Sequence, residues 1–228
     1  MKTDIEKIKS GVLSLFQGVL GVSATMFSEP GELILSASRS VQALRNKRFI
    51  NQLLEELNMY KDKGTLKDQF YIRDKFQEGF VSLMTLLDTK VISEDIFYLL
   101  KAILVSSVHV NTTEEDEIEA HMIMEIAKDL TSSQYLILTA CHKVSIDPNK
   151  KYHGVSNAGD WIRGVLEFSP IRLPALIELE DEKLVEKGLL EQRKFGDKSG
   201  IRIGAHFRQT DLCKRMFELI EQYEKISV

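Results

Sequence analysis

Three helix-start signals follow one another between residues 93 and 134, and they constrain the fold more than any other feature of the chain. Ser93 stands directly before an acidic pair. Thr112 is followed three residues later by Glu115, and the same spacing separates Thr131 from Gln134. A hydroxyl at the start of a helix accepts a backbone N–H, and an acidic or amide side chain three residues later returns the bond. We therefore expect three consecutive helices here.

Apolar periodicity predicts helices in most of the remaining chain. Phe76, Phe80, Leu83 and Leu87 recur at spacings of four, three and four, which is the pattern of one helix face. The same criterion, with proline and glycine as punctuation, predicts the other helices. Three of them span residues 4–27, 33–61 and 96–110, and two more end near Leu130 and near Val144. The others are a short helix around Trp161, a helix over 174–187 and a last helix beginning after Thr210.

The last fifth of the chain carries the only strand-like pattern. Apolar and polar residues alternate from Ile201 to Arg208, as a half-buried antiparallel strand requires. Residues 196–200 read as a turn, so a partner strand is predicted over 189–195. A helix, a hairpin and a closing helix in this order are typical of a winged helix. We expect a mainly α protein, with an N-terminal multi-helix bundle at 1–146 and a winged-helix-like domain at 155–228, joined by the polar stretch 147–154.

The two parts of this predicted C-terminal domain carry net charges of opposite sign. Helix 174–187 carries five acidic residues against two basic ones, whereas basic residues outnumber acidic ones by seven to three between residues 189 and 215. Phosphates would be repelled by that helix and attracted by the hairpin. The candidate nucleic-acid contacts are therefore Arg193, Lys194, Lys198, Arg202, His206 and Arg208.

Two uses of this domain remain open at this point. In the first, the hairpin contacts a nucleic-acid backbone. In the second, the domain packs against a protein partner and makes no contact with nucleic acid. The whole chain has a formal charge of −4, so no global basic field attracts nucleic acid. We expect a non-enzymatic binding protein that associates with itself or with another protein.

Candidate reactive residues do not assemble into a recognisable motif. Glu117, His121 and Glu125 share one helix face, but no second element offers matching metal ligands. We expect this face to be solvated and the opposite face, which includes Ile118 and Met122, to meet the core. Cys141 and His142 are adjacent on a helix and point about 100° apart, so they cannot pair. The sequence predicts no enzyme, no metal and no cofactor.

The N-terminal segment 11–27 contains no charged residue. It also holds three glycines and several polar residues, and it is shorter than the roughly 20 strongly apolar residues of a spanning helix. We expect a packed or interfacial helix, with a membrane-proximal role as the alternative. The two cysteines are too few for a disulfide framework, which favours a cytoplasmic protein.

Four short features together resemble a group of bacterial helical proteins associated with abortive infection. They are the glycine-containing apolar segment 11–27, the basic stretch 45–48 before Leu53 and Leu54, the helix opening at 130–134, and the junction 208–215, which resembles that between wing and helix in bacterial winged helices. The resemblance implies a bacterial or phage origin and a phage-defence role, and it carries over no catalytic residue. The acidic helix 174–187 departs from a winged helix that reads DNA.

Overall fold

The computed structural model describes residues 30–149, 158–196, 200–202 and 205–227. These residues are mainly helical, which confirms the mainly α part of the expected fold class. The chain divides into two compact units, residues 1–62 and residues 63–228. The helix predicted over 4–27 lies outside the described residues, and so does the apolar segment 11–27.

The described part of the first unit is the helix α2 (Pro30–Asp62). Its start differs from the predicted 33–61 because Pro30 is helical. Proline is tolerated in the first turn of a helix, where its missing N–H would have no intrahelical partner. Leu53, Leu54 and Leu57 are buried, as a stripe on one helix face requires, whereas Leu44, expected on the same stripe, is 69% exposed.

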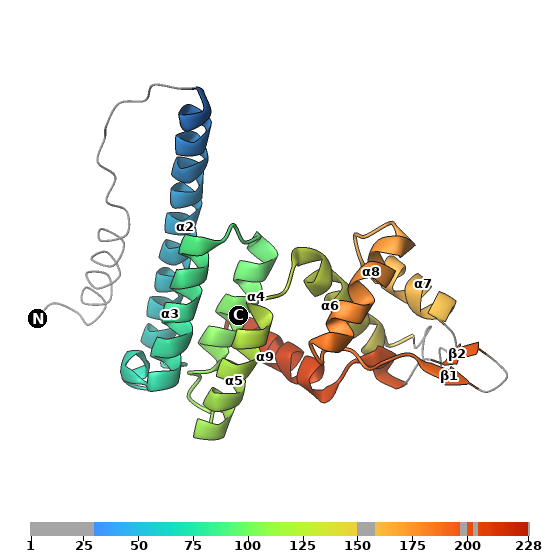
Figure 1. Ribbon diagram of the computed structural model, residues 1–228. Helices are drawn as coiled ribbons and strands as arrows, with labels where there is room; N and C mark the ends of the chain where they lie inside the picture. Colours follow the sequence, from blue (N-terminus) through green and yellow to red (C-terminus); the bar gives the residue numbers. More distant parts are fainter. Residues whose placement is uncertain (1–29, 150–157, 197–199, 203–204, 228) are drawn as a thin grey trace, which may run out of the picture. The chain divides into compact units, whose positions relative to one another are not determined.

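The second unit is a succession of helices interrupted by one short hairpin (Figure 1). In chain order its elements are η1 (Phe70–Ile72), α3 (Asp74–Thr89), α4 (Glu94–Ser106), α5 (Glu114–Ala127), α6 (Ser132–Ser145), α7 (Ala158–Phe168), α8 (Pro174–Glu186), β1 (Lys194–Gly196), β2 (Gly200–Arg202), η2 (Ala205–Arg208) and α9 (Asp211–Ser227).

Two of the three predicted helix starts are confirmed. The Ser93 hydroxyl accepts the backbone N–H of Ile96, and Thr131 forms a complete capping box with Gln134.

The remaining predicted helix start, at Thr112, is displaced by one residue. The helix α5 starts after Thr113, which forms the capping box with Asp116. A hydroxyl residue stands three positions before an acidic residue in both Thr112–Glu115 and Thr113–Asp116, so the spacing alone does not distinguish the two. The Thr112 hydroxyl instead donates to the carbonyls of Ser107 and His109, which leaves the cap to Thr113.

Helix α4 lies at the centre of the second unit and packs against α9. The Ser106 hydroxyl donates to the Leu219 carbonyl at 2.6 Å. The rings of Tyr98 and Tyr223 meet edge to face with their centroids 5.6 Å apart. Figure 1 shows α9 running from the hairpin back to α4 and α5. The division predicted at 147–154 therefore differs from the observed one, because the last helix belongs to the core of the same unit as α4.

The end of α8 follows the predicted glycine signal. Gly188 has a φ of +71°, a left-handed backbone that glycine adopts without steric cost. Its N–H bonds to the Val185 carbonyl, and the Leu189 N–H bonds to the Leu184 carbonyl. This pair of bonds satisfies carbonyls at the end of the helix and turns the chain toward the hairpin.

The hairpin is much shorter than the sequence pattern suggested. Strands β1 and β2 are antiparallel, with Lys194 opposite Arg202 and Gly196 opposite Gly200. Residues 205–208, predicted as strand, form the 3₁₀ helix η2. Within the described residues only Gly200–Arg202 of the predicted second strand region is extended, and a winged-helix domain with its β-hairpin is therefore not supported.

The departure from strand geometry has a tertiary cause. Phe207 and Arg208 both have left-handed backbones, with φ values of 56° and 68°, which costs about 1–3 kcal/mol for each non-glycine residue. This conformation accompanies the packing of the Phe207 ring against Trp161 and Gly164 of α7. Burial of Phe207 and Arg208 offsets the backbone strain.

Gly164 gives the Phe207 ring its space. A Cβ atom at residue 164 would lie 2.4 Å from the ring tip of Phe207, so we expect Gly164→Ala to lower the free energy of unfolding by about 1–3 kcal/mol despite the better helix propensity of alanine. Denaturant unfolding followed by circular dichroism measures the change. Phe207→Leu combined with Gly164→Ala should recover part of it, and a stable Gly164→Ala single variant would contradict this packing.

Candidate functional site

Arg208, a predicted phosphate contact, is buried inside the second unit. Its side chain is 1% exposed. Its Nη1 lies 2.5 Å from Asp181 Oδ1 on α8, and its Nε donates to the Glu191 carbonyl at 2.8 Å. A guanidinium held in this way cannot reach a phosphate on the surface, so Arg208 is withdrawn from the candidate nucleic-acid contacts.

Arg193, another predicted contact, serves the same internal cluster. Its Nε lies 2.9 Å from Asp181 Oδ2, so both oxygens of this carboxylate face a guanidinium. The guanidinium carbons of Arg193 and Arg208 lie 5.2 and 4.7 Å from the centre of the buried Trp161 ring. Cation–π attraction at such distances adds to the ion pairs. The cluster joins α7, α8 and the residues on either side of the hairpin.

The other four predicted contacts, Lys194, Lys198, Arg202 and His206, have side chains outside the described part of the chain. The backbones of Lys194 and Arg202 pair across the hairpin. For these four residues, nucleic-acid contact stays a prediction.

Part of the acidic charge of α8 is also used internally. Asp181 holds the two arginines, and Glu180 accepts a hydrogen bond from Gln134 at 2.7 Å and another from Lys183 at 3.2 Å. Both carboxylates belong to buried residues. The repulsive field expected from the sequence is therefore weaker than the residue count suggests, and the outward acids are Glu178, Glu182 and Glu186.

The outward face of α8 carries an apolar stripe that the sequence reasoning missed. Leu173, Leu176 and Leu179 are 62%, 44% and 60% exposed. Leu173 is the extended N-cap residue of α8, and Leu176 and Leu179 follow at helical spacing on one side of the helix. We call these residues the leucine stripe. The spacing was visible in the sequence, but the buried face of α8 mixes Ile177 and Leu184 with Glu180 and Asp181, so periodicity alone could not tell which leucines face solvent.

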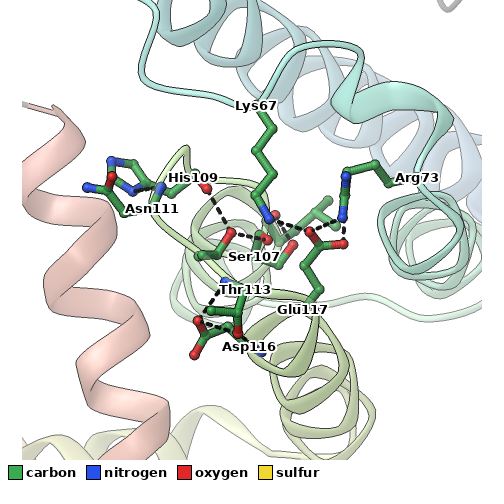
Figure 2. Close-up of polar contacts among 10 residues, drawn as sticks. Lys67, Arg73, Ser107, His109, Asn111, Thr113, Asp116 and Glu117 are labelled. Carbon is green, nitrogen blue, oxygen red and sulfur yellow. Dashed lines mark hydrogen bonds and ion pairs between the residues drawn. The ribbon is translucent and has the colours of Figure 1, made fainter.

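A second charged cluster surrounds Glu117 on α5 (Figure 2). Lys67 Nζ lies 2.6 Å from Glu117 Oε1, and Arg73 Nε donates to Glu117 Oε2 at 2.8 Å. Burial acts to raise the pKa of Glu117, but the hydrogen bonds and charges of Arg73 and Lys67 outweigh it and hold the pKa below its usual value. The cluster fastens the segment before α3 to the first turns of α5.

The expected orientation of α5 is wrong. The face carrying Glu117 and His121 packs toward α3, where His121 Nε2 lies 3.4 Å from Glu78. Glu125 on the same face accepts a hydrogen bond from Ser82 of α3 at 3.0 Å. The opposite residues Ile118 and Met122 are 42% and 62% exposed. The inner face also buries Ala120, Ile123 and Met124, and the ion pairs at Glu117 compensate the carboxylate that lies among them.

The former metal and nucleophile candidates do not form a reactive centre in the described residues. No group of three or more His, Cys, Asp or Glu side chains there could hold a metal ion.

Cys141 and Cys213 are buried; burial raises the pKa of both thiols, that of Cys213 to about 12. Thiols with such pKa values are not nucleophilic thiolates at neutral pH. The His142 ring stacks on Phe217, and its Nε2 lies 3.1 Å from Glu221 Oε1, so its contacts are with α9 and not with the Cys141 thiol.

Comparison of the chain with protein-family models, with curated proteins and with solved structures found no match in any of the three. Within the described residues, no helix combines the length and the apolar character needed to cross a membrane. The leucine stripe, on the helix beside the Asp181 cluster, is thus the candidate functional surface of the second unit.

Because the Asp181 cluster is buried, we expect a single substitution in it to lower the unfolding free energy substantially. Arg208→Met leaves a buried carboxylate with one cation instead of two, and we expect a loss of about 3 kcal/mol in unfolding free energy. Lys75→Met, which removes the exposed pair with Glu78, should cost no more than about 0.5 kcal/mol. Chemical denaturation of both variants measures the two values, and similar values would show that the buried cluster is not stabilising.

The Glu117 cluster predicts a pH-dependent contribution to stability. Because the folded pKa is lowered, the stabilisation is present above the unfolded pKa of about 4 and is lost as the pH falls through the folded pKa. Glu117→Gln should therefore lower the unfolding free energy by about 3 kcal/mol at neutral pH, with the difference shrinking on acidification. Denaturation series at several pH values test this, with the exposed Glu114→Gln as the control. A difference that stays constant with pH would contradict it.

Proposed function

We propose that this chain is a non-enzymatic, cytoplasmic binding protein that self-associates through the leucine stripe of α8. The observation that carries the proposal is the exposure of Leu176 and Leu179 on α8 and of its N-cap residue Leu173, while the other side of the helix is held by buried ion pairs. The occupant of the stripe is a second copy of the chain.

The first support is the cost of leaving such a stripe in water. Burying a leucine side chain is worth about 1.5–3 kcal/mol, and contiguous apolar surface of this kind marks interaction sites. The neighbouring Pro174 and Ala175 are exposed as well, so the stripe has no polar cover at the start of α8. A protein surface of matching apolar character is the partner that this chemistry fits.

The second support is the distribution of charge along α8. Arg172, an exposed cation, stands just before the helix, and exposed Glu182 and Glu186 lie toward its end. Two copies of α8 packed antiparallel would bring each Arg172 toward the acidic end of the partner helix. The helix dipoles favour the same arrangement, because antiparallel helices place opposite partial charges side by side. A self-complementary face of this kind is what a two-fold interface requires.

The alternative use of the C-terminal region, a winged helix that contacts nucleic acid, has lost part of its support. Arg193 and Arg208 pair with Asp181, and the stripe occupies the helix that would enter a groove. A contact through Lys194, Lys198, Arg202 and His206 is therefore an outcome for experiment. The phage-defence role implied by the resemblance would be exercised by the self-associated protein. The membrane-proximal alternative rests on residues 11–27, and no observation on the described residues favours it.

Self-association can be tested directly with the full chain. We expect the wild type to be a dimer in the micromolar range and Leu176→Lys with Leu179→Lys to be a monomer, because paired lysines would meet across the two-fold interface. Multi-angle light scattering and sedimentation equilibrium measure the mass. Val81→Lys, a matched change at an exposed aliphatic residue of α3, should leave the dimer intact. A monomeric wild type, or a dimeric double variant with native circular dichroism, would overturn the proposal.

A duplex DNA measurement separates the hairpin from the stripe. Fluorescence anisotropy at low salt should give no binding beyond the weak level of an acidic control protein. Salt-sensitive binding that Arg202→Glu abolishes, and that the α8 double variant retains, would instead make the hairpin the functional surface.

A further inference from the structure

A groove between α5 and α9 is a second feature with the form of a binding surface. This open groove has a volume of about 520 Å³. Met122, Ile123 and Leu212 form its apolar part, and Glu119, Arg215 and Glu218 stand among its charged residues. The groove exists because α5 presents Met122 outward, on the face that the sequence pattern had placed in the core.

The outer face of α5 extends the groove along the helix. Ile118 is 42% exposed, one turn before Met122, which is 62% exposed. Exposed Glu115 and Glu119 flank them at helical spacing. This face is therefore apolar along its middle and acidic at its edge, which is the complement of an amphipathic helix with basic flanks.

The charges around the groove do not balance. Arg215 alone serves three carboxylates: Nε lies 3.0 Å from Glu119, Nη1 lies 3.1 Å from Glu218, and Nη2 contacts Asp116. Lys214 pairs with Asp211 at 2.8 Å. Among these described groups, four carboxylates face two cations. One guanidinium cannot neutralise three carboxylates, so the rim has a residual negative potential that a cationic ligand would relieve.

We propose that this groove binds a basic amphipathic helix of a partner protein. The apolar side chains of that helix would enter between α5 and α9, over Met122 and Leu212, and its lysines or arginines would reach Glu119 and Glu218. Helix-in-groove recognition of this kind reads apolar anchors spaced three and four residues apart. The negative rim disfavours nucleic acid and anionic lipid, and it disfavours a second copy of the same rim. This surface is separate from the leucine stripe.

The probe for this proposal is a synthetic amphipathic peptide of about 18 residues, roughly five helical turns, with leucine on one face and lysine on the other. A matched peptide carries glutamate in place of lysine. Titration calorimetry with the full chain should show binding of the lysine peptide, weakened by added salt, and no binding of the glutamate peptide. Equal binding of the two peptides, or no binding of the lysine peptide, overturns the proposal.

Two variants distinguish a seated helix from general attraction to an acidic protein. Met122→Gln keeps the charge and removes the apolar anchor, and we expect it to weaken binding of the lysine peptide about ten-fold. Val81→Gln, the same change at an exposed residue of α3, should have no effect. Unchanged affinity of Met122→Gln, with its native circular dichroism retained, would show that the groove is not the site. Leu176→Lys with Leu179→Lys should keep peptide binding, so loss of self-association and loss of groove binding are read separately.

Discussion

The shared carboxylate of Asp181 organises the C-terminal half of the second unit. It draws in Arg208 from after the hairpin and Arg193 from before it, and both guanidinium groups lie over Trp161 of α7. The left-handed backbone at Phe207 and Arg208 accompanies this geometry. The inner side of α8 makes these contacts, and its leucine stripe faces solvent.

A comparable constraint acts on α5. Lys67 and Arg73 compensate Glu117 on the inner face, so this helix turns Ile118 and Met122 outward. In both helices the buried face combines apolar side chains with compensated carboxylates: Ala120, Ile123 and Met124 beside Glu117 in α5, and Ile177 and Leu184 beside Asp181 in α8. A buried charge is costly unless it is compensated, so these ion pairs make the observed rotation of each helix compatible with burial of its carboxylates. The two proposed binding surfaces, the leucine stripe and the α5–α9 groove, are consequences of these two rotations.

Local signals predicted the helices well. Ser93, Thr131 and Gly188 act as helix boundaries through bonds among residues a few positions apart, which a single sequence reveals directly. The start of α5 was displaced by one residue, because two threonines compete for one cap. The outer faces of α5 and α8 were not predicted, since periodicity measures where apolar residues recur and not what the opposite face meets.

The sequence by itself determined the helical class, most helix boundaries and the charge contrast between helix 174–187 and the residues after it. The tertiary structure decided which of those charges are available. Asp181 and Arg208 are separated by 27 residues, and Glu117 and Lys67 by 50, so their pairing depends on how helices pack rather than on any local pattern. Packing thereby buried Arg208, engaged Arg193 with Asp181, and exposed apolar residues on α5 and α8, because an ion pair between residues far apart in sequence can form only once the chain has folded around it.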